Sequence, residues 1–292
     1  MTFGVWLRLG RVSNLPTVWS NTLAGSVLAG SALALGAGWQ AGLCLALSLF
    51  YVGGMYLNDA FDRDIDRKER PERPIPSGVV RASTVFGIGF SLLLVGVVAS
   101  FSLGRAHDPA YGTSTLCAAL ALATAIVAYD LYHKQNPLSP LLMGLCRVLV
   151  YVTAASAAAG APSPAVWLGA AALLSHLIGL TYAAKQENLR VIQNLWPLGF
   201  LLLPVAYGVF LGLQQPLVLV CALVYLAWLT YALSFLVRRE ERSIPGGVVR
   251  LIAGISLLDA MLLAAAGALE LALVAMLLCG ATRLAQRYVP GT

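Results

Sequence analysis

Residues 83–104 read STVFGIGFSLLLVGVVASFSLG, a run that contains no charged side chain. An α-helix rises ~1.5 Å per residue, so about 20 apolar residues cross the ~30 Å hydrocarbon core of a bilayer. The rest of the chain has the same character, since 59% of its 292 residues are hydrophobic and 11% are charged. Soluble domains carry about 25% charged residues. The composition therefore predicts an integral membrane protein.

Similar apolar runs recur along the whole chain and predict one all-α domain, residues 1–292, built as a bundle of about nine transmembrane helices. These runs are continuously apolar, whereas the strands of a membrane barrel alternate between apolar and polar residues. A last apolar run, Leu271 to Ala281, is either a short tenth span or a continuation of the ninth. The predicted spans are 17–36, 39–57, 83–104, 114–131, 141–159, 164–184, 196–213, 216–237 and 248–268.

Lys and Arg predict how the chain is oriented, because short cytoplasmic loops retain positive charge. With the N-terminus inside, fifteen of the nineteen basic residues lie on the cytoplasmic side, and only Arg105 lies opposite. The side of Arg283 and Arg287 depends on whether a tenth span exists. We therefore predict a multi-pass protein of the inner or plasma membrane, with its N-terminus and residues 58–81 cytoplasmic. This asymmetry accounts for the net charge of +6, so the expected partner is the lipid bilayer and not nucleic acid.

The loop after the second span, residues 58–81, is dense in charge and begins NDAFDRDIDRKERPE. Successive residues of a helix are about 100° apart. If the second span continues as a helix, one of its faces carries four oxygen-bearing side chains, and Asp64 and Lys68 point away from that face. These four are Asn58, Asp59, Asp62 and Asp66. Mg²⁺ is commonly bound through one or two carboxylates, while water and substrate phosphate complete its shell. This face is therefore predicted to bind Mg²⁺ and a phosphorylated ligand.

Two other interpretations of the loop do not involve a phosphorylated ligand. An EF-hand that starts at Asp62 would need Gly at its sixth position and Glu at its twelfth. Arg67 and Arg73 occupy those positions, which excludes it. A solvated loop whose charges merely follow the positive-inside rule remains the alternative, although it gives no reason for carboxylates at positions i, i+3 and i+7 directly after a span.

The loop resembles the first signature of the UbiA superfamily of intramembrane prenyltransferases, N-D-x-x-D-x-x-x-D followed by R-P-[ILV]-x-x-G. The second part reads RPIPSG at residues 73–78. The resemblance implies that the four side chains on the shared face hold Mg²⁺ together with the diphosphate of a polyprenyl donor. YDLYHK, residues 129–134, is similar to a Tyr-x-x-x-Lys-type signature whose basic residue approaches the diphosphate. Within the superfamily, the chain is most similar to the EboC branch.

The chain departs from the family pattern after the sixth span, where the family has a second aspartate motif that binds another Mg²⁺. Residues 182–190 here read YAAKQENLR, and Glu187 is the only acid among them. A reduced site is then expected, in which Glu187 binds metal, Arg190 shares its helical face, and Lys185 neutralises diphosphate. The alternative is a solvated loop that carries the basic residues of the cytoplasmic side.

Polar side chains inside the spans are costly in lipid and are functional candidates. Asn21 in the first span is predicted to orient the acceptor or to help bind the ligand. Arg147 in the fifth span is predicted to supply a cation that faces the diphosphate. For both residues, the alternative is a structural contact between helices.

The resemblance implies a membrane prenyltransferase that uses Mg²⁺ to transfer a polyprenyl group from an allylic diphosphate to a hydrophobic, aromatic or other electron-rich acceptor. The predicted catalytic residues are Asp59, Asp62, Asp66, Lys134 and Lys185. The predicted substrate contacts are Asn21, Asn58, Arg70, Arg73, Tyr129, Arg147, Glu187 and Arg190, and the predicted metal ligands are Asn58, Asp59, Asp62, Asp66 and Glu187. The missing second motif favours an alternative, a non-catalytic carrier that binds a prenyl or anionic lipid without turnover.

Overall fold

The structure, a computed structural model, describes residues 3–30, 36–134, 136–185, 196–237 and 243–291. Every regular element in these ranges is a helix, as predicted. The elements are α1 (Phe3–Leu9), the 3₁₀ helix η1 (Val12–Asn14), α2 (Leu15–Leu28), α3 (Ala37–Phe61), α4 (Arg63–Glu69), α5 (Ala82–His107), α6 (Tyr111–Tyr132), α7 (Ser139–Ala159), α8 (Pro164–Lys185), the 3₁₀ helix η4 (Trp196–Leu201), α9 (Leu202–Gly212), α10 (Pro216–Val237), α11 (Ile244–Ala265) and α12 (Leu269–Ala285).

Seven of the described helices are long and apolar enough to cross a membrane. They are α3, α5, α6, α7, α8, α10 and α11. Each coincides with a predicted span to within a few residues at either end, because a continuous apolar run of this length is itself the signal for a spanning helix. The prediction of an all-helical membrane protein is therefore confirmed.

Three predicted spans differ from the helices observed. In the first, 17–36, the helix among the described residues is the 14-residue α2, which ends at Leu28 and at ~1.5 Å per residue is too short to cross the hydrocarbon core alone. The seventh, 196–213, is divided into η4 and α9. The possible tenth span is a separate helix, α12, because the chain turns at Gly267, whose φ of 78° lies in the left-handed region that glycine adopts readily.

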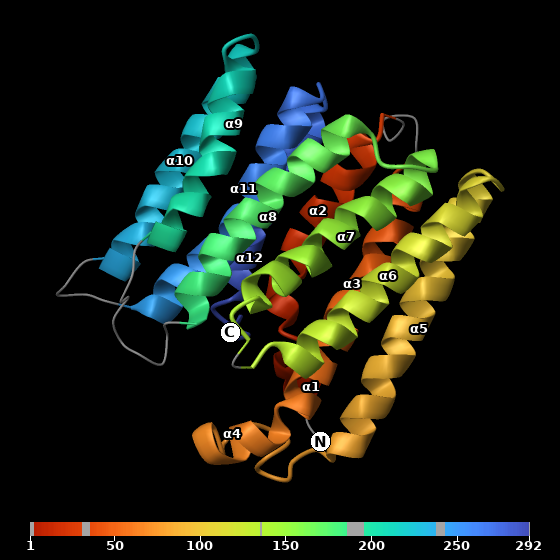
Figure 1. The fold of residues 1–292 in the computed structure, drawn as a ribbon, viewed down its shortest axis with the longest axis vertical. Helices are drawn as coiled ribbons and strands as arrows, with labels where there is room; N and C mark the ends of the chain where they lie inside the picture. Colours follow the sequence, from red (N-terminus) through yellow and green to blue (C-terminus); the bar gives the residue numbers. More distant parts are fainter. Residues whose placement is uncertain (1–2, 31–35, 135, 186–195, 238–242, 292) are drawn as a thin grey trace.

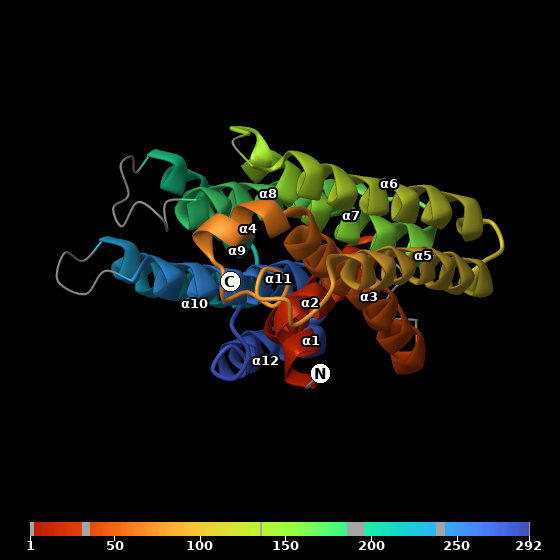
Figure 2. The ribbon, with the colours of Figure 1, turned by 90° about the horizontal axis from the view of Figure 1, so that it is seen from below.

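Figure 1 shows the helices running roughly side by side, with both termini and α4 near the lower end of the view. Seen from that end in Figure 2, α1 and α2 lie near the middle, with α6, α7 and α8 on one side and α10, α11 and α12 on the other. The central helix α2 packs against α3, α7, α11 and α12. A polar side chain on α2 can therefore contact helices from both halves of the chain.

The C-terminal helix returns to the end of the bundle that carries the acidic loop. Gln286 donates from Nε2 to Oδ1 of Asn14 at 2.9 Å, and Asn14 donates from Nδ2 to the carbonyl of Gly291 at 2.9 Å. These contacts place Arg283 and Arg287 at the same end of the bundle as Arg11. Their position agrees with the charge asymmetry predicted from the other basic residues.

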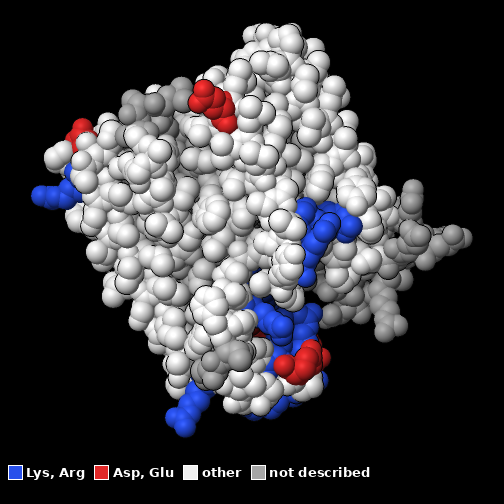
Figure 3. Space-filling model, turned by 180° about the vertical axis from the view of Figure 1, so that it is seen from behind, with Lys and Arg blue, Asp and Glu red and all other residues white. Residues whose placement is uncertain are grey.

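Most of the surface drawn in Figure 3 carries no charged side chain, and the largest group of Lys, Arg, Asp and Glu lies in its lower part. Large apolar side chains such as Leu94, Phe210 and Leu277 are mostly exposed on the helices. An apolar surface of this extent is unfavourable in water and suits a lipid environment.

Close contact between α2 and α7 depends on Gly25. A Cβ atom at this position would lie 2.7 Å from the carbonyl oxygen of Tyr151 and 2.8 Å from its Cα. Because backbone atoms cannot rotate aside, we expect Gly25→Ala to destabilise the protein by about 1–3 kcal/mol, measured as a lower thermal unfolding temperature in detergent. Gly87→Ala on α5 is the control, since nothing lies within 4 Å of the added atom. Equal effects of the two substitutions would contradict this close approach.

Candidate functional site

The acidic loop begins as a continuation of α3. Although α3 ends at Phe61, the amide of Asp62 donates to the carbonyl of Asn58 at 2.9 Å, and the amide of Asp66 donates to that of Asp62 at 2.8 Å. Helical geometry thus persists through Asp62 into α4. As a result, the four side chains of the predicted face are all buried, namely Asn58, Asp59, Asp62 and Asp66. Asp64 and Lys68 are exposed, as the helical angles predicted.

Arginine side chains pair with two of these aspartates. Arg73 donates from Nη1 to Oδ2 of Asp66 at 2.7 Å and to Oδ1 of Asp59 at 3.3 Å. Arg11, which precedes α2, donates to the same Asp59 oxygen at 3.1 Å. Burial has the largest single effect on Arg11 and lowers its pKa, but the raising effects of Asp59, Tyr51, Tyr129 and Asp62 together are larger. The pKa is therefore raised and the guanidinium stays charged.

The loop that returns Arg73 to the aspartates explains the second half of the motif. Residues 73–78 form tight turns, in which the amide of Ser77 donates to the carbonyl of Arg73 at 3.0 Å. Gly78 has a φ of 77°, a conformation that side-chain-bearing residues rarely adopt. The chain then turns into α5, and Arg73 stays beside the end of α3.

The third aspartate is paired with the end of α6. Lys134 Nζ lies 3.1 Å from Oδ2 of Asp62, and Nε2 of His133 lies 3.4 Å from the same oxygen. Burial raises the pKa of Asp62, whereas hydrogen bonds and positive charge from His133 and Lys134 lower it. The lowering effects are larger together, so the pKa is held below its ordinary value and the carboxyl is ionised at neutral pH.

These aspartates retain donor atoms suited to a hard cation. Asp59, Asp62 and Asp66 each use one carboxylate oxygen in the ion pairs above, and no hydrogen bond within the described ranges engages the other oxygen. No three His, Cys, Asp or Glu side chains in the described part of the chain lie close enough together to hold a metal ion between them. Mg²⁺ does not require three, because water and phosphate oxygens usually complete a shell begun by one or two carboxylates. The donor set therefore fits Mg²⁺ bound together with a phosphorylated ligand.

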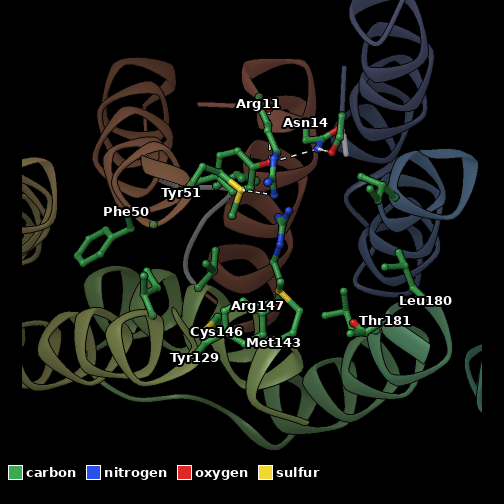
Figure 4. A pocket seen from close by; sticks show the side chains of 18 of the residues that line it. Arg11, Asn14, Phe50, Tyr51, Tyr129, Met143, Cys146, Arg147, Leu180 and Thr181 are labelled. Carbon is green, nitrogen blue, oxygen red and sulfur yellow. Dashed lines mark hydrogen bonds between the residues drawn. The ribbon is translucent and has the colours of Figure 1, made fainter. Parts of the chain in front are cut away.

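An inner cavity of about 280 Å³ lies between the halves of the bundle, and its wall includes Arg11 and Arg73, which both pair with Asp59. Its polar wall includes Arg11, Tyr51, Arg73 and Arg147, and Figure 4 shows the guanidinium groups of Arg11 and Arg147 pointing toward each other into it. Two facing cations make this part of the cavity suited to an anion. The rest of its wall is mainly apolar and includes Val18, Leu47, Phe50, Leu122, Ile126, Val150, Leu177, Leu180, Val248, Ile252 and Ile255.

An outer cavity of about 710 Å³ adjoins the inner cavity beneath α4. Arg70 and Tyr129 line both cavities. Lys134 and Lys185 line the outer cavity, and Lys185 donates to the carbonyl of Asn136 at 2.7 Å. The predicted cationic contacts Arg70, Lys134 and Lys185, at the C-terminal ends of α4, α6 and α8, thus all line the outer cavity.

Arg147 is held in the inner cavity by α2. Its Nη1 donates to Oδ1 of Asn21 at 2.9 Å, and its Nη2 donates to Oγ1 of Thr17 at 3.1 Å. The guanidinium also lies over the ring of Tyr51, 5.4 Å from its centroid. Asn21 is fully buried and does not line the cavity, so its predicted direct contact with a ligand is not supported, and its contact toward the cavity is the hydrogen bond with Arg147. Arg147 itself faces the cavity, where the sequence predicted a cation.

The other side of Asn21 contacts a buried carboxylate on α11. Its Nδ2 donates to Oδ2 of Asp259 at 2.8 Å, and Ser20 donates to the same oxygen. Tyr151 donates to Oδ1 of Asp259. This network, which we call the Asp259 network, joins α2, α7 and α11 behind the cavity.

Several residues of the site were not predicted. Arg11, Asp130 and Asp259 lie apart from the acidic loop in sequence. Asp130 lies within the YDLYHK stretch at residues 129–134, whereas charge within an apolar run is the only signal that singles out Asp259. Arg63 and Arg67 pair with exposed Asp64 at 3.7 and 3.6 Å and line neither cavity. Glu187 and Arg190 lie outside the described residues, so their predicted roles stay predictions.

Comparison with known proteins identifies the family. The profile of the UbiA prenyltransferase family matches residues 13–288, nearly the whole chain. The chain belongs to this family. This UbiA-family protein is 30% identical to the digeranylgeranylglyceryl phosphate synthase of Methanopyrus kandleri over 236 residues, which cover 77% of this chain and 78% of that one. It is 29% identical to the enzyme of the same name from Ignicoccus hospitalis, covering 77% and 71% of the two chains.

Solved structures share the fold of this UbiA-family protein. A UbiA homologue from Archaeoglobus fulgidus bound to GPP and Mg²⁺ superposes with a TM-score of 0.61 at 13% identity, covering 90% of this chain and 99% of that one. A structure described as that of a digeranylgeranylglyceryl phosphate synthase gives a TM-score of 0.60 at 20% identity and covers 91% and 98%. None of these matches singles out the EboC branch, which stays a prediction.

Proposed function

We propose that this UbiA-family protein is a Mg²⁺-dependent membrane prenyltransferase whose donor is an allylic prenyl diphosphate. The observation that carries the proposal is the inner cavity, which joins an apolar chamber to facing Arg11 and Arg147 beside buried Asp59, Asp62 and Asp66. An anionic head group and a hydrocarbon tail have opposite requirements, and this cavity offers both. The Archaeoglobus homologue bound to GPP and Mg²⁺ supports the same ligand class.

In the proposed reaction, the bond between the allylic carbon and the diphosphate oxygen breaks, and a bond forms from that carbon to the acceptor, which loses a proton. Mg²⁺ held by the aspartates supplies positive charge to the diphosphate when bound. Arg11 and Arg73, already beside the carboxylates, donate hydrogen bonds to phosphate oxygens, and Lys134 adds charge from the outer cavity. Apolar walls around the tail exclude water that would otherwise capture the allyl cation.

The acceptor is electron-rich and enters the same cavity. An aromatic ring that attacks through carbon and a hydroxyl group that attacks through oxygen both satisfy this requirement. The relatives from Methanopyrus and Ignicoccus are named as digeranylgeranylglyceryl phosphate synthases, so a glyceryl phosphate ether belongs in the test panel beside aromatic acceptors.

The proposal predicts that purified protein releases diphosphate from one of a panel of C10 to C20 prenyl diphosphates when Mg²⁺ and a suitable acceptor are present. Release should stop when EDTA removes the metal, because the negative charge that develops on the leaving diphosphate is then no longer neutralised. Direct chromatographic quantification of the diphosphate gives the rate, because it needs no Mg²⁺-dependent coupling enzyme that EDTA would also inhibit. Mass spectrometry of the extracted lipid identifies the product.

A non-catalytic carrier is the second candidate, favoured by the single acid, Glu187, after α8. A carrier would bind a prenyl diphosphate, seen as a higher unfolding temperature with ligand, without releasing diphosphate. Binding without release across the whole panel would establish the carrier and exclude the enzyme. Absence of both binding and release would contradict both candidates.

A further inference from the structure

Asp130, near the end of α6, is a buried carboxylate that none of the motifs considered above assigns to a role. It is 4% exposed and lines the inner cavity. Its Oδ1 accepts a hydrogen bond from Nδ2 of Asn58 at 3.1 Å. Its Oδ2 is buried and has no hydrogen-bond partner, and Asp130 forms no ion pair within the described ranges.

An unpaired carboxylate oxygen in this position is unfavourable unless something else binds it. Buried charges in proteins are paired with an opposite charge or bind a metal, and a buried polar atom without a partner commonly marks the place of an ion or a water molecule. Asp59, Asp62 and Asp66 are each paired with a cation of this chain. Asp130 differs from them because no basic side chain of the described residues forms an ion pair with it.

The contact with Asn58 connects Asp130 directly to the predicted metal ligands. A carboxylate only accepts hydrogen bonds, so the amide nitrogen of Asn58 must face Asp130. The amide oxygen of Asn58 then remains available to a cation. Asp130 therefore lies one side chain away from the acidic face of α3 and α4, on a different helix.

We propose that Asp130 is a further carboxylate ligand of the divalent cation at the diphosphate site, contributed by α6. This inference rests on the proposed function and adds to it a residue outside both aspartate motifs of the family. The family's second aspartate motif is missing here, since Glu187 is the only acid among residues 182–190, and the carboxylate of Asp130 would replace part of the missing negative charge. The ligand is a hard divalent cation, for which carboxylate oxygens are preferred donors.

The test measures Mn²⁺ binding directly, by electron paramagnetic resonance of the purified protein with inorganic diphosphate present. Mn²⁺ suits the same carboxylate ligands as Mg²⁺. Asp130→Asn keeps the shape of the side chain and is expected to weaken Mn²⁺ affinity by about tenfold to a hundredfold, the range typical for the loss of groups around a metal. Glu72→Gln makes the same chemical change at an exposed position of the acidic loop outside both cavities, so its affinity should stay within about twofold of the wild type.

Two further variants separate the possible failures. Asp62→Asn alters the predicted site itself, and Asp130→Glu keeps the negative charge and should retain binding better than Asp130→Asn. Loss of binding in Asp62→Asn together with unchanged binding in Asp130→Asn would overturn the role of Asp130 alone. Equal losses in Asp130→Glu and Asp130→Asn would also overturn it, because packing would then explain both. A wild-type protein that binds no Mn²⁺ would contradict the metal dependence of the proposed function.

A second readout distinguishes a ligand from a residue needed only for folding. Without metal, Asp130→Asn should unfold at the same temperature as the wild type or higher, because the substitution replaces a buried carboxyl group whose Oδ2 has no hydrogen-bond partner. With Mn²⁺ and diphosphate, the wild type should gain thermal stability through binding, and the variant should gain less. A variant that unfolds at a much lower temperature without metal would assign Asp130 a structural role and overturn the proposal.

Discussion

Asp62→Asn is expected to lower the rate of prenyl transfer by about a hundredfold or more, with little change in thermal stability. The carboxylate is ionised at neutral pH and lies beside Lys134 and His133 at the junction of α3 and α4. Removing one group that stabilises developing charge in a transition state commonly costs ~10²–10³ in rate. The rate is measured as diphosphate release under saturating Mg²⁺ and donor.

The control for this prediction is Glu72→Gln, which removes an exposed acid from the same loop and should leave the rate unchanged. An Asp62→Asn protein that keeps more than about half of the wild-type rate would show that the acidic face does not take part in the reaction. If both variants lose activity to the same extent, the general charge of the loop is responsible and not the buried carboxylate.

Asp259→Ala is expected to cause the largest loss of stability. The substitution removes the acceptor for three buried donors, on Ser20, Asn21 and Tyr151, and each unsatisfied buried group costs about 1–3 kcal/mol. We therefore expect a loss of about 3 kcal/mol or more, measured as a lower unfolding temperature in detergent. Donor binding should weaken too, because Asn21 no longer fixes Arg147 in the cavity.

Glu270→Gln is the matched control for Asp259, since it neutralises the exposed acid at the start of α12. Its unfolding temperature should equal that of the wild type. Asp259→Asn should fall between the two, because an amide keeps one acceptor oxygen but turns a second donor toward the network. An Asp259→Ala protein as stable as the wild type would show that the network does not stabilise the bundle.

Much of the fold follows from sequence patterns that act over short distances. Apolar runs of about 20 residues identified all seven long apolar helices in the described ranges, because each helix satisfies its own backbone hydrogen bonds. The runs were less informative about α2, which ends at Leu28 within a longer apolar stretch, and about the division of the seventh span into η4 and α9. After α2, Gly30 adopts a φ of 97°, a conformation that glycine favours just beyond a helix end. Hydrophobicity alone therefore does not mark where a helix ends.

The face of the acidic loop was predictable for the same reason. Asp59, Asp62 and Asp66 are separated by three and four residues, so a single helix places them together whatever surrounds it. Which cations they contact was not predictable. Arg11 precedes Asp59 by 48 residues, and no local pattern relates the two.

By itself, the sequence determined that the chain is a helical membrane protein and that four oxygen-bearing side chains share one face at the end of α3. Both are properties of one helix, set by its length and its rotation per residue. Only the tertiary structure decided that Asp130 lies beside Asn58, 72 residues away, and that Asp259 holds Asn21 at a separation of 238. Such contacts depend on which helices pack together, and packing is specified by the shapes of many side chains at once, not by any local repeat.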